Sequence, residues 1–313
     1  MPRPWLRVGV VGAGRVGAVL GAALAAAGHR VVAVSAVSEA SRERADALLP
    51  GVPVQPVEDV VAAGDLVLLA VPDDALADLV AGLGARGLWR PGQIAAHTSG
   101  RHGLAPFAPA ADRGVLPLAL HPAMTFTGTS LDLARLTECC FGITAPDPVR
   151  AVAEALVVEM GGEPVWVPEE ARTLYHAALA HGSNHLVTLV AQAREILAAA
   201  GIEDGERLLR PLLQASLDGS LASGDGALTG PVSRGDVGTL AAHLDALEPL
   251  AEDLRPAYVA HATATAHRAA RTRRLRPDQA DAVLAALGEA GTPPSPLSSP
   301  AVPPPTPDEK DHR

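Results

Sequence analysis

The stretch LRVGVVGAGRVGAVLGAALAAAGHRVVAVS (residues 6–35) contains two apolar runs, at 6–11 and 29–35, separated by a glycine-rich turn and an Ala- and Leu-rich segment. Short apolar runs bounded by glycine are typical of buried strands, and the segment between them, which Gly28 closes, has the composition of a helix. The stretch therefore predicts one strand–helix–strand unit, from which the rest of the fold extends.

The glycines of this unit follow the first strand and open the helix in the spacing G-x-G-x-x-G. The first glycine makes a tight turn, the second lets the backbone approach a pyrophosphate, and the third lets the helix pack on the strand. The helix N-terminus then offers N–H groups to phosphate. This predicts a dinucleotide site, with close helix packing alone as the alternative, formed by Gly12, Ala13, Gly14, Arg15, Val16 and Gly17.

The second strand ends at Ser35, where an enzyme that uses NAD usually places Asp or Glu on the ribose hydroxyls. Ser38, Arg42 and Arg44 follow. A hydroxyl and a guanidinium hold a 2′-phosphate, whereas a carboxylate repels it, so Ser35 and Arg42 favour NADP. The alternative is that Arg42 and Arg44 only solvate a helix.

Further apolar runs predict strands at 65–72, 93–99, 114–122, 139–145 and 163–168, and a helix at about 148–160. Near-continuous apolar strands indicate a parallel sheet covered on both faces. After Pro168 the pattern is almost wholly helical. The predicted class is α/β, a Rossmann-type doubly wound parallel sheet (1–168) followed by an all-helical second domain (169–290) and a Pro-rich disordered tail (291–313).

Composition excludes several classes of partner. The chain has 313 residues and a formal net charge of −10, which argues against nucleic acid and against anionic membrane surfaces. The adjacent Cys139 and Cys140 point to opposite faces of a strand, so neither a disulfide framework nor a metal site is expected, which suits a reducing cytoplasm. Arg15 interrupts the apolar N-terminal run, so no targeting segment or membrane span is expected.

Ligands of open parallel sheets lie outside the carboxyl ends of the strands. The segments after three strands, VPDD (71–74), HTSG (97–100) and HPAMTF (121–126), are therefore expected to border a nicotinamide, with Val71 and Pro72 among the cofactor contacts. His97 lies inside its strand and is expected to be a structural histidine with satisfied hydrogen bonds. Ser99 and His121 end their strands, where they either line the cleft or are structural.

The helix that contains YHAALAHGSNHL (175–186) carries an unusual number of polar residues for an Ala- and Leu-rich segment. At 100° per residue, His176, Ala180 and Ser183 share one stripe, with Asn184 at its edge. His181 and His185 fall on a second polar stripe and are expected to be solvated or at a subunit contact. A third, apolar stripe contains Tyr175, Leu179, Leu186, Leu189 and Val190.

The segment LTGPVSRGD (228–236) offers Arg234 to a substrate carboxylate and Thr229 as a hydrogen-bonding group. Asp236 is expected to cap the helix at 237–247, and His243 on that helix is expected to be structural. Arg234 has an alternative role in a salt bridge to Asp236 or Asp225.

The order of these motifs, from GAGRVG through YHAALAHGSNHL to ALTGPVSRGD (227–236), resembles the Rossmann-like proteins that carry the C-terminal domain of unknown function 2520. They are similar in plan to ketopantoate reductase, pyrroline-carboxylate reductase and the 3-hydroxyacid dehydrogenases of the 6-phosphogluconate dehydrogenase-like superfamily. The resemblance implies an NADP-linked reductase, ketopantoate as the first candidate substrate, and a homodimer.

One departure from these families concerns the catalytic lysine that they place four residues before an Asn. If Asn184 is that Asn, the lysine position is Ala180, and the only lysine of the chain is Lys310. A carbonyl reduction needs a proton donor, and His176 is the predicted one, with Asn184 and Ser183 orienting the carbonyl and Arg234 binding the carboxylate. The alternatives are a hydrogen bond from His176 to Asn184 or a loop, reduction of a cyclic imine, and a cofactor-binding protein without turnover.

Overall fold

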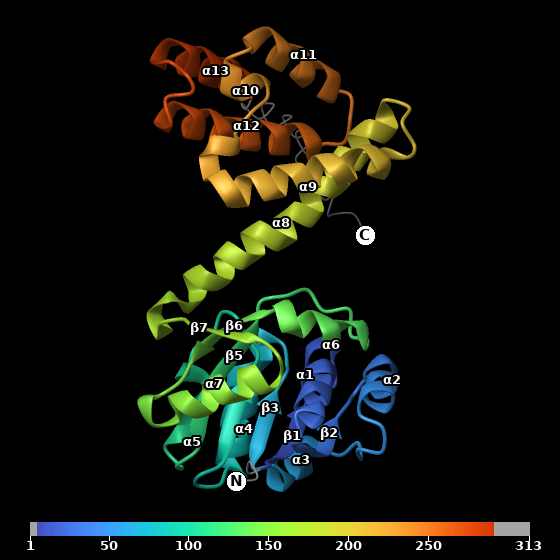
Figure 1. The fold of residues 1–313 in the computed structure, drawn as a ribbon, viewed down its shortest axis with the longest axis vertical. Coiled ribbons are helices and arrows are strands. Elements are labelled where there is room, and N and C mark those ends of the chain that lie inside the picture. Colours follow the sequence, from blue (N-terminus) through green and yellow to red (C-terminus); the bar gives the residue numbers. More distant parts are fainter. Residues whose placement is uncertain (1–4, 291–313) are drawn as a thin grey trace, which may run out of the picture. The chain divides into compact units, whose positions relative to one another are not determined.

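The computed structural model describes residues 5–290, and these form a seven-stranded sheet followed by helices (Figure 1). The sheet order is β2-β1-β3-β4-β5-β6-β7. Each apolar run that the sequence marks forms a strand, which confirms the predicted α/β class. The strands are β1 (Arg7–Val11), β2 (Arg30–Ser35), β3 (Leu66–Leu69), β4 (Ile94–His97), β5 (Leu116–Pro122), β6 (Cys140–Thr144) and β7 (Glu163–Trp166).

The first five strands are parallel, whereas β6 runs antiparallel to β5, and β7 is parallel to β6. The expectation of a wholly parallel sheet is therefore wrong at its last two strands. The connection from β5 to β6 holds only the short helices α6 (Leu131–Arg135) and η2 (Leu136–Glu138). A parallel return needs a crossover, usually a helix packed across the sheet, and this connection has none of that length.

The strand order reverses between β1 and β3, because β2 lies on one side of β1 and β3 on the other. A parallel bridge between Val34 and Val54 marks a rudimentary further strand beyond β2. In such sheets the ligand crevice lies outside the carboxyl ends of the strands at the reversal. The glycine turn after β1 stands at this point.

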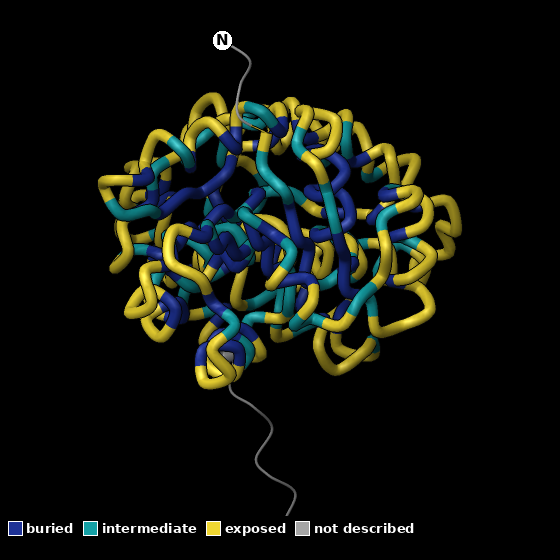
Figure 2. Tube along the Cα trace, turned by 90° about the horizontal axis from the view of Figure 1, so that it is seen from below, coloured by how far each residue is buried: buried dark blue, intermediate teal, exposed yellow. Residues whose placement is uncertain are grey.

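Helices cover both faces of the sheet, and Figure 2 shows buried residues along the strands inside a shell of exposed ones. One face packs against α1 (Arg15–Ala26), α2 (Glu39–Leu48) and α7 (Arg150–Glu159) through side chains that include Leu20, Leu24 and Leu156. The other face packs against α3 (Val57–Ala63), α4 (Asp73–Ala85), η1 (Ala105–Phe107) and α5 (Ala108–Ala111) through Val80 and Phe107. The two cores hold the carboxyl ends of the strands in fixed register.

After Trp166 the chain is helical, as the sequence predicts. The described residues as a whole form two compact units that divide between His185 and Leu186, inside one continuous helix of 28 residues, whereas the sequence predicts a domain boundary at Pro168. The second unit has its own small core, in which Leu240, Ala266 and Val283 are fully buried. The remaining helices are η3 (Asp147–Val149), η4 (Glu169–Ala171), α8 (Arg172–Ala199), α9 (Gly205–Ser223), η5 (Gly224–Ala227), α10 (Pro231–Arg234), α11 (Val237–Leu247), α12 (Leu254–Arg271) and α13 (Pro277–Ala290).

Two expectations concern other parts of the chain. The predicted disordered tail at 291–313, with Lys310, lies outside the described residues. Between residues 5 and 290, no helix combines the length and the apolar character that crossing a membrane requires.

Candidate functional site

The glycine turn after β1 gives each of its three glycines a different environment. Gly12 has φ +95°, and a Cβ there would lie 2.5 Å from the carbonyl oxygen of Ala70. A Cβ on Gly17 would collide with the carbonyl oxygen of Gly12. A Cβ on Gly14 would meet nothing within 4 Å. The outer glycines are thus required by the fold, whereas Gly14 faces open space.

The first turn of α1 begins beside this open space. Gly14 is the N-cap residue and makes no side-chain capping bond, so the N–H groups of the first turn stay available to a ligand. Ala13 is buried, whereas Arg15 is exposed. Val71 packs beside Gly12, and Pro72 caps α4 on the neighbouring strand end. These residues fit the pyrophosphate of a dinucleotide.

Ser35, the last residue of β2, and Ser38 after it both have hydrogen-bond partners within the protein. The hydroxyl of Ser35 is buried and accepts a hydrogen bond from the N–H of Gly12 at 2.9 Å, so it braces the glycine turn. The hydroxyl of Ser38 caps α2 by accepting from the N–H of Ser41. Of the residues proposed for a 2′-phosphate, only the guanidiniums of Arg42 and Arg44 make no hydrogen bond or ion pair within residues 5–290.

His97 and Ser99 after β4 are both buried and both serve the loop that follows. His97 bonds through Nε2 to the carbonyl oxygen of Gly103 at 2.7 Å, while Nδ1 accepts from the N–H of Ser99. The hydroxyl of Ser99 accepts from the N–H of His102. His97 is therefore the satisfied structural histidine that the sequence predicts, and Ser99 holds the loop instead of lining the cleft.

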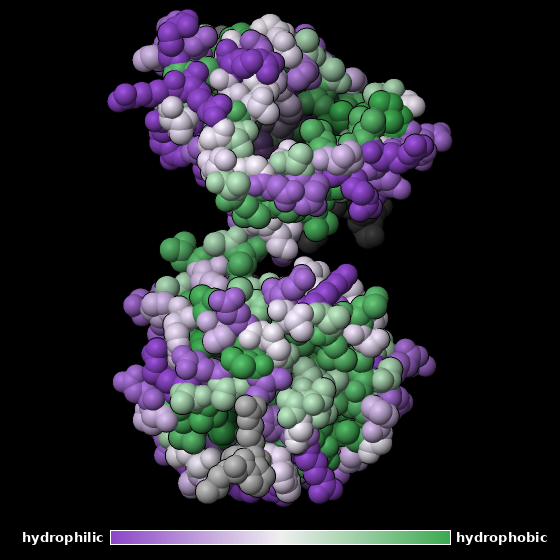
Figure 3. Space-filling view, in the orientation of Figure 1, coloured by the Kyte–Doolittle hydropathy of each residue, from purple (hydrophilic) through white to green (hydrophobic). Residues whose placement is uncertain are grey.

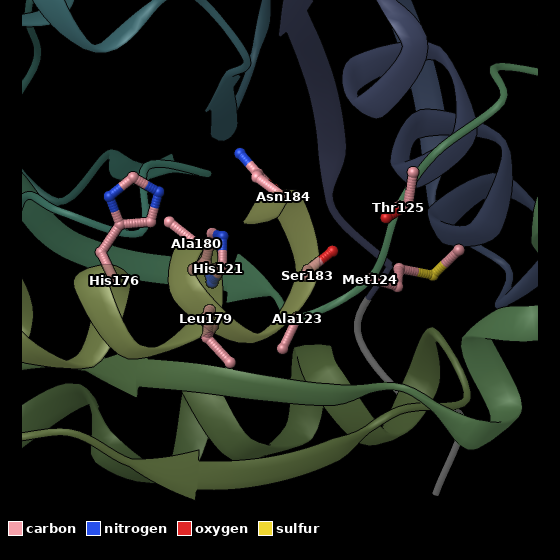
Figure 4. Close-up of a pocket in the computed structure, with 9 residues that line it drawn as sticks. All are labelled: His121, Ala123, Met124, Thr125, His176, Leu179, Ala180, Ser183 and Asn184. Carbon is pink, nitrogen blue, oxygen red and sulfur yellow. The ribbon is translucent and has the colours of Figure 1, made fainter. Parts of the chain in front are cut away.

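A pocket of about 370 Å³ lies between the end of β5 and the first half of α8, inside the first compact unit (Figure 4). His176, Ser183 and Asn184 line it, so the polar stripe predicted on the helix faces one cavity together with Ala180. His121 reaches the same cavity from β5. The remaining lining residues are Ala123, Met124, Thr125 and Leu179.

The two imidazoles of the pocket are neighbours. The ring centroids of His121 and His176 are 6.0 Å apart and the rings are nearly perpendicular. A Cβ on Gly100, in the loop after β4, would lie 2.7 Å from Cδ2 of His176 and 2.9 Å from Nε2 of His121. The rings therefore approach this loop so closely that only a glycine fits there.

His121 forms a hydrogen bond with Tyr175, whose hydroxyl lies 2.9 Å from Nδ1 of the imidazole. Burial lowers the pKa of His121 to about 4, and His176 and the cation of Arg172 act in the same direction. The imidazole is therefore neutral at pH 7. Helical periodicity places Tyr175 on an apolar stripe, because it describes the ring of a tyrosine and not the partner of its hydroxyl.

Arg172, at the start of α8, is a second site residue that the sequence does not reveal. Its side chain is 1% exposed, and its guanidinium donates to the hydroxyl of Thr144 and to the carbonyl oxygens of Ala119 and Gly142. Nη1 has no hydrogen-bond partner in the described part of the chain. This buried cation, held by β5 and β6, lies within electrostatic range of His121 and His97.

The remaining predicted polar residues have other partners or are exposed. His181 and His185 are exposed and contact each other, with their Nδ1 atoms 2.9 Å apart. Arg234 forms an ion pair of 2.9 Å with Asp236, the alternative noted from the sequence. Asp236 precedes α11 as its N-cap residue, although its carboxylate makes no capping bond. Thr229 is exposed.

Other expected features can be checked in the described residues. Cys139, just before β6, is buried, and Cys140, the first residue of β6, is exposed. Between residues 5 and 290, no group of three or more His, Cys, Asp or Glu side chains is placed to hold a metal ion. His243, expected to be structural, bonds to the hydroxyl of Tyr258 at 2.8 Å.

The fold and the site together define a two-part protein with a glycine turn for a dinucleotide and an adjoining imidazole pocket. Residues 1–122 match the family model of the Rossmann-like domain, and residues 139–265 match the domain of unknown function 2520. The chain carries these two domains in the order that its motifs predict. No curated protein matches the chain.

Several solved structures share the fold. A candidate NADP oxidoreductase from Bacteroides fragilis has a TM-score of 0.70 and 21% identity, covering 83% of this chain and 98% of its own. An imine reductase from Pseudomonas sp. has a TM-score of 0.60 and 20% identity, covering 92% and 99%. A reductive aminase from Aspergillus terreus, solved with NADPH and ethyl-5-oxohexanoate, has a TM-score of 0.56 and 17% identity, covering 92% and 94%. At these identities the likeness is one of fold.

The two buried histidines predict how stability depends on pH. The pKa of both His97 and His121 is lowered to about 4, chiefly by burial. Between pH 6.5 and pH 4 the unfolded chain therefore binds protons at these histidines, whereas the folded chain does not. The stabilisation contributed by the two neutral imidazoles is fully present above pH 6.5 and is lost as the pH falls towards 4, by about 3 kcal/mol for each histidine.

Urea unfolding at about pH 7 and about pH 4.5 measures this loss. His97→Asn is expected to remove a large part of the pH dependence, whereas His267→Asn, at an exposed position on α12, is expected to leave it unchanged. An unfolding free energy for the native chain that is equal at both pH values would contradict the assignment of buried neutral imidazoles.

Proposed function

We propose that this chain is an NADP-dependent oxidoreductase that reduces a polarised double bond, first of all the carbonyl of a small 2-oxo acid. The observation that carries the proposal is that the open glycine turn and the imidazole pocket stand at the same edge of one sheet, in one compact unit. From β1 to β5 the distance is three strand spacings, roughly 14 Å. In this proposal the Rossmann-type domain at 1–168 holds the cofactor, and the helical domain at 169–290 contributes to substrate binding and dimerisation.

The cofactor assignment is supported by the fit of the glycine turn and by two relatives. The Gly14 position leaves room for a phosphate beside free N–H groups. No carboxylate stands at the end of β2, and Arg42 follows on α2, which favours a 2′-phosphate. The Bacteroides protein is described as a candidate NADP oxidoreductase, and the Aspergillus enzyme binds NADPH.

The chemistry divides between cofactor and chain. The chemistry that NADPH would supply when bound is a hydride for the carbonyl carbon, with NADP⁺ as the other product; the carbonyl oxygen would take up one proton, so that C=O would become CH–OH. His176 is the proposed proton donor, with Ser183 and Asn184 as hydrogen-bonding groups that orient the carbonyl. Ala180, which the pocket contains where related families place a lysine, provides no proton, so the imidazole has to do so.

Ketopantoate is the first candidate substrate because of the resemblance to ketopantoate reductase. Reduction of a cyclic imine is the second, and one observation favours it: no Arg, Lys, Asp or Glu lines the pocket. Arg234, the proposed ligand of a substrate carboxylate, is paired with Asp236. A protonated imine needs no proton donor for reduction of its carbon. A third candidate, cofactor binding without turnover, rests on the absence of a lysine from the pocket.

Gly14→Val tests the cofactor site without strain in the fold, because Gly14 has φ −70° and a Cβ there meets nothing within 4 Å. We expect NADPH affinity to fall at least about a hundredfold, since the side chain fills the space of the pyrophosphate. Gly82→Val on α4 is the matched control, because its Cβ also meets nothing within 4 Å. Isothermal titration measures both. Wild-type affinity in Gly14→Val would place the nucleotide elsewhere.

A panel of ketopantoate, other 2-oxo acids and pyrroline carboxylates, assayed by NADPH consumption beside NADH, tests the reaction. For a carbonyl substrate, His176→Ala is expected to lower kcat by about 10²–10⁴-fold, because a positioned proton donor is lost. For a cyclic imine the loss is expected to be below about tenfold, because the nitrogen arrives protonated. Tight NADPH binding with no oxidation by any member of the panel would instead support the protein without turnover.

We further propose that the chain is a homodimer. Within the second unit, Gly205 is the only buried residue of α9, and apolar side chains along α8 and α9 reach solvent (Figure 3). Val187, Leu212 and Leu221 are 70%, 63% and 79% exposed. Exposed apolar surfaces of this kind commonly mark subunit contacts, and a second copy of the chain is the proposed occupant.

Light scattering after size exclusion measures the mass. We expect a dimer at micromolar concentration and a monomer for the pair Leu212→Asp and Leu221→Asp. Leu131→Asp, at a leucine of α6 that is 68% exposed, serves as control and is expected to remain dimeric. A monomeric native chain would refute the proposal.

A further inference from the structure

The contacts behind His121 suggest a role for Tyr175, a residue that borders the pocket without lining it. The Tyr175 hydroxyl is 2.9 Å from Nδ1 of His121, and the two rings are perpendicular. Nε2, on the opposite side of the imidazole, has no hydrogen-bond partner in the described part of the chain. It lies toward His176, the other imidazole of the cavity, beside Gly100.

The groups around the phenol of Tyr175 determine whether its oxygen or Nδ1 of His121 carries the proton of their hydrogen bond. Burial raises the pKa of Tyr175, so the phenol keeps its proton at pH 7, while the Arg172 cation and the backbone of Gly142 act in the opposite direction. Of these two neighbours, the backbone N–H of Gly142 acts as a hydrogen-bond donor to the phenol oxygen, whereas Arg172 acts through its charge. Since the oxygen already faces this donor, its own proton is left to donate to Nδ1.

The packing around Tyr175 keeps this arrangement rigid. A Cβ on Gly142 would collide with the Tyr175 hydroxyl, so the glycine in β6 makes room for it. Arg172, one turn earlier on α8, is fixed by Thr144, Ala119 and Gly142, and its guanidinium carbon lies 5.8 Å from the centre of the Tyr175 ring. Strands β5 and β6 and helix α8 thus hold the phenol and the imidazole at one distance.

We propose that Tyr175 is a positioning residue that acts through His121: its O–H donates to Nδ1, and this keeps the imidazole proton on Nε2, the nitrogen that serves the pocket. His121 then offers a neutral N–H donor to the oxygen of a bound carbonyl, beside the proton donor His176. This deepens the proposed function and rests on it only for the catalytic consequence. The protonation of the imidazole itself can be measured in the chain without cofactor or substrate.

The balance of the charged and titratable groups around His121 favours a neutral ring. From α8 it faces Tyr175, His176 and Arg172, and from α4 it faces Asp73. His176 and Arg172 disfavour the imidazolium, whereas Asp73 favours it with a smaller effect than burial. Removing the Tyr175 hydroxyl removes the donor that stabilises the neutral form, so the pKa of His121 is expected to rise from about 4.

The test is ¹⁵N NMR of the histidine side chains in the full chain at neutral pH. In the wild type we expect His121, assigned with His121→Gln, to show a protonated Nε2 and an unprotonated Nδ1. In Tyr175→Phe we expect a mixture of both tautomers and a raised pKa. Tyr258→Phe is the matched control, because Tyr258, the other tyrosine of the chain, bonds to Nδ1 of His243 at 2.8 Å. It is expected to leave His121 unchanged.

The kinetic part of the test uses whichever substrate the panel identifies. Tyr175→Phe is expected to lower kcat about tenfold at unchanged NADPH affinity, the effect of losing one positioned hydrogen bond. A proton on Nδ1 in the wild type would overturn the proposal, and so would the same tautomer in Tyr175→Phe. Failure of every substrate would refute the proposed function alone, since the tautomer is read without turnover.

Discussion

The close approach of helix α1 to strands β1 and β3 is the constraint on which the rest of the structure depends. Gly12 and Gly17 have no room for a side chain, because a Cβ on either would meet the backbone of Ala70 or of Gly12. Ser35 secures the same turn from β2 by accepting the N–H of Gly12. Because α1 lies so near the sheet, its free N–H groups and the open space beside Gly14 face the same region, outside the carboxyl ends of the strands.

The pocket depends on a second constraint, a buried cation that forms no ion pair with a carboxylate within residues 5–290. Arg172 donates to two carbonyl oxygens and one hydroxyl, so strands β5 and β6 satisfy most of its donors. The burial of His121 and, after it, the charge of Arg172 disfavour a second proton on the imidazole. The imidazole of His121, which would otherwise titrate near neutral pH, is therefore neutral there. It presents one hydrogen-bond donor and one acceptor, in positions set by its neighbours.

Sequence patterns predicted the features that depend on spacing along the chain. The glycine turn, the strands, and the stripe of His176, Ala180, Ser183 and Asn184 all follow from periodicity and from the φ that glycine permits. The missed features depend on contacts between distant segments. Arg172 and Tyr175 bond to residues of β5 and β6 that lie 28 to 54 positions away in the chain, and the antiparallel β6 depends on a loop without a crossover helix.

The same distinction explains the reassigned polar residues. Ser35 and Ser99 end strands as expected, but a hydroxyl at a strand end satisfies a nearby backbone N–H as readily as it binds a ligand. Arg234 forms an ion pair with the carboxylate of Asp236, two residues away. A polar side chain that has a hydrogen-bond or ion-pair partner nearby therefore gives little indication of a ligand site. The Gly14 position differs, because a Cβ there would meet nothing within 4 Å.

The proposed function requires that one nucleotide spans from the glycine turn to the imidazole pocket. A crystal structure of the chain with NADPH tests this most directly. We expect the pyrophosphate on the first turn of α1 beside Gly14, and the nicotinamide ring at the cavity lined by His121 and His176. A nucleotide bound away from the glycine turn, or one whose nicotinamide points away from that cavity, would contradict it.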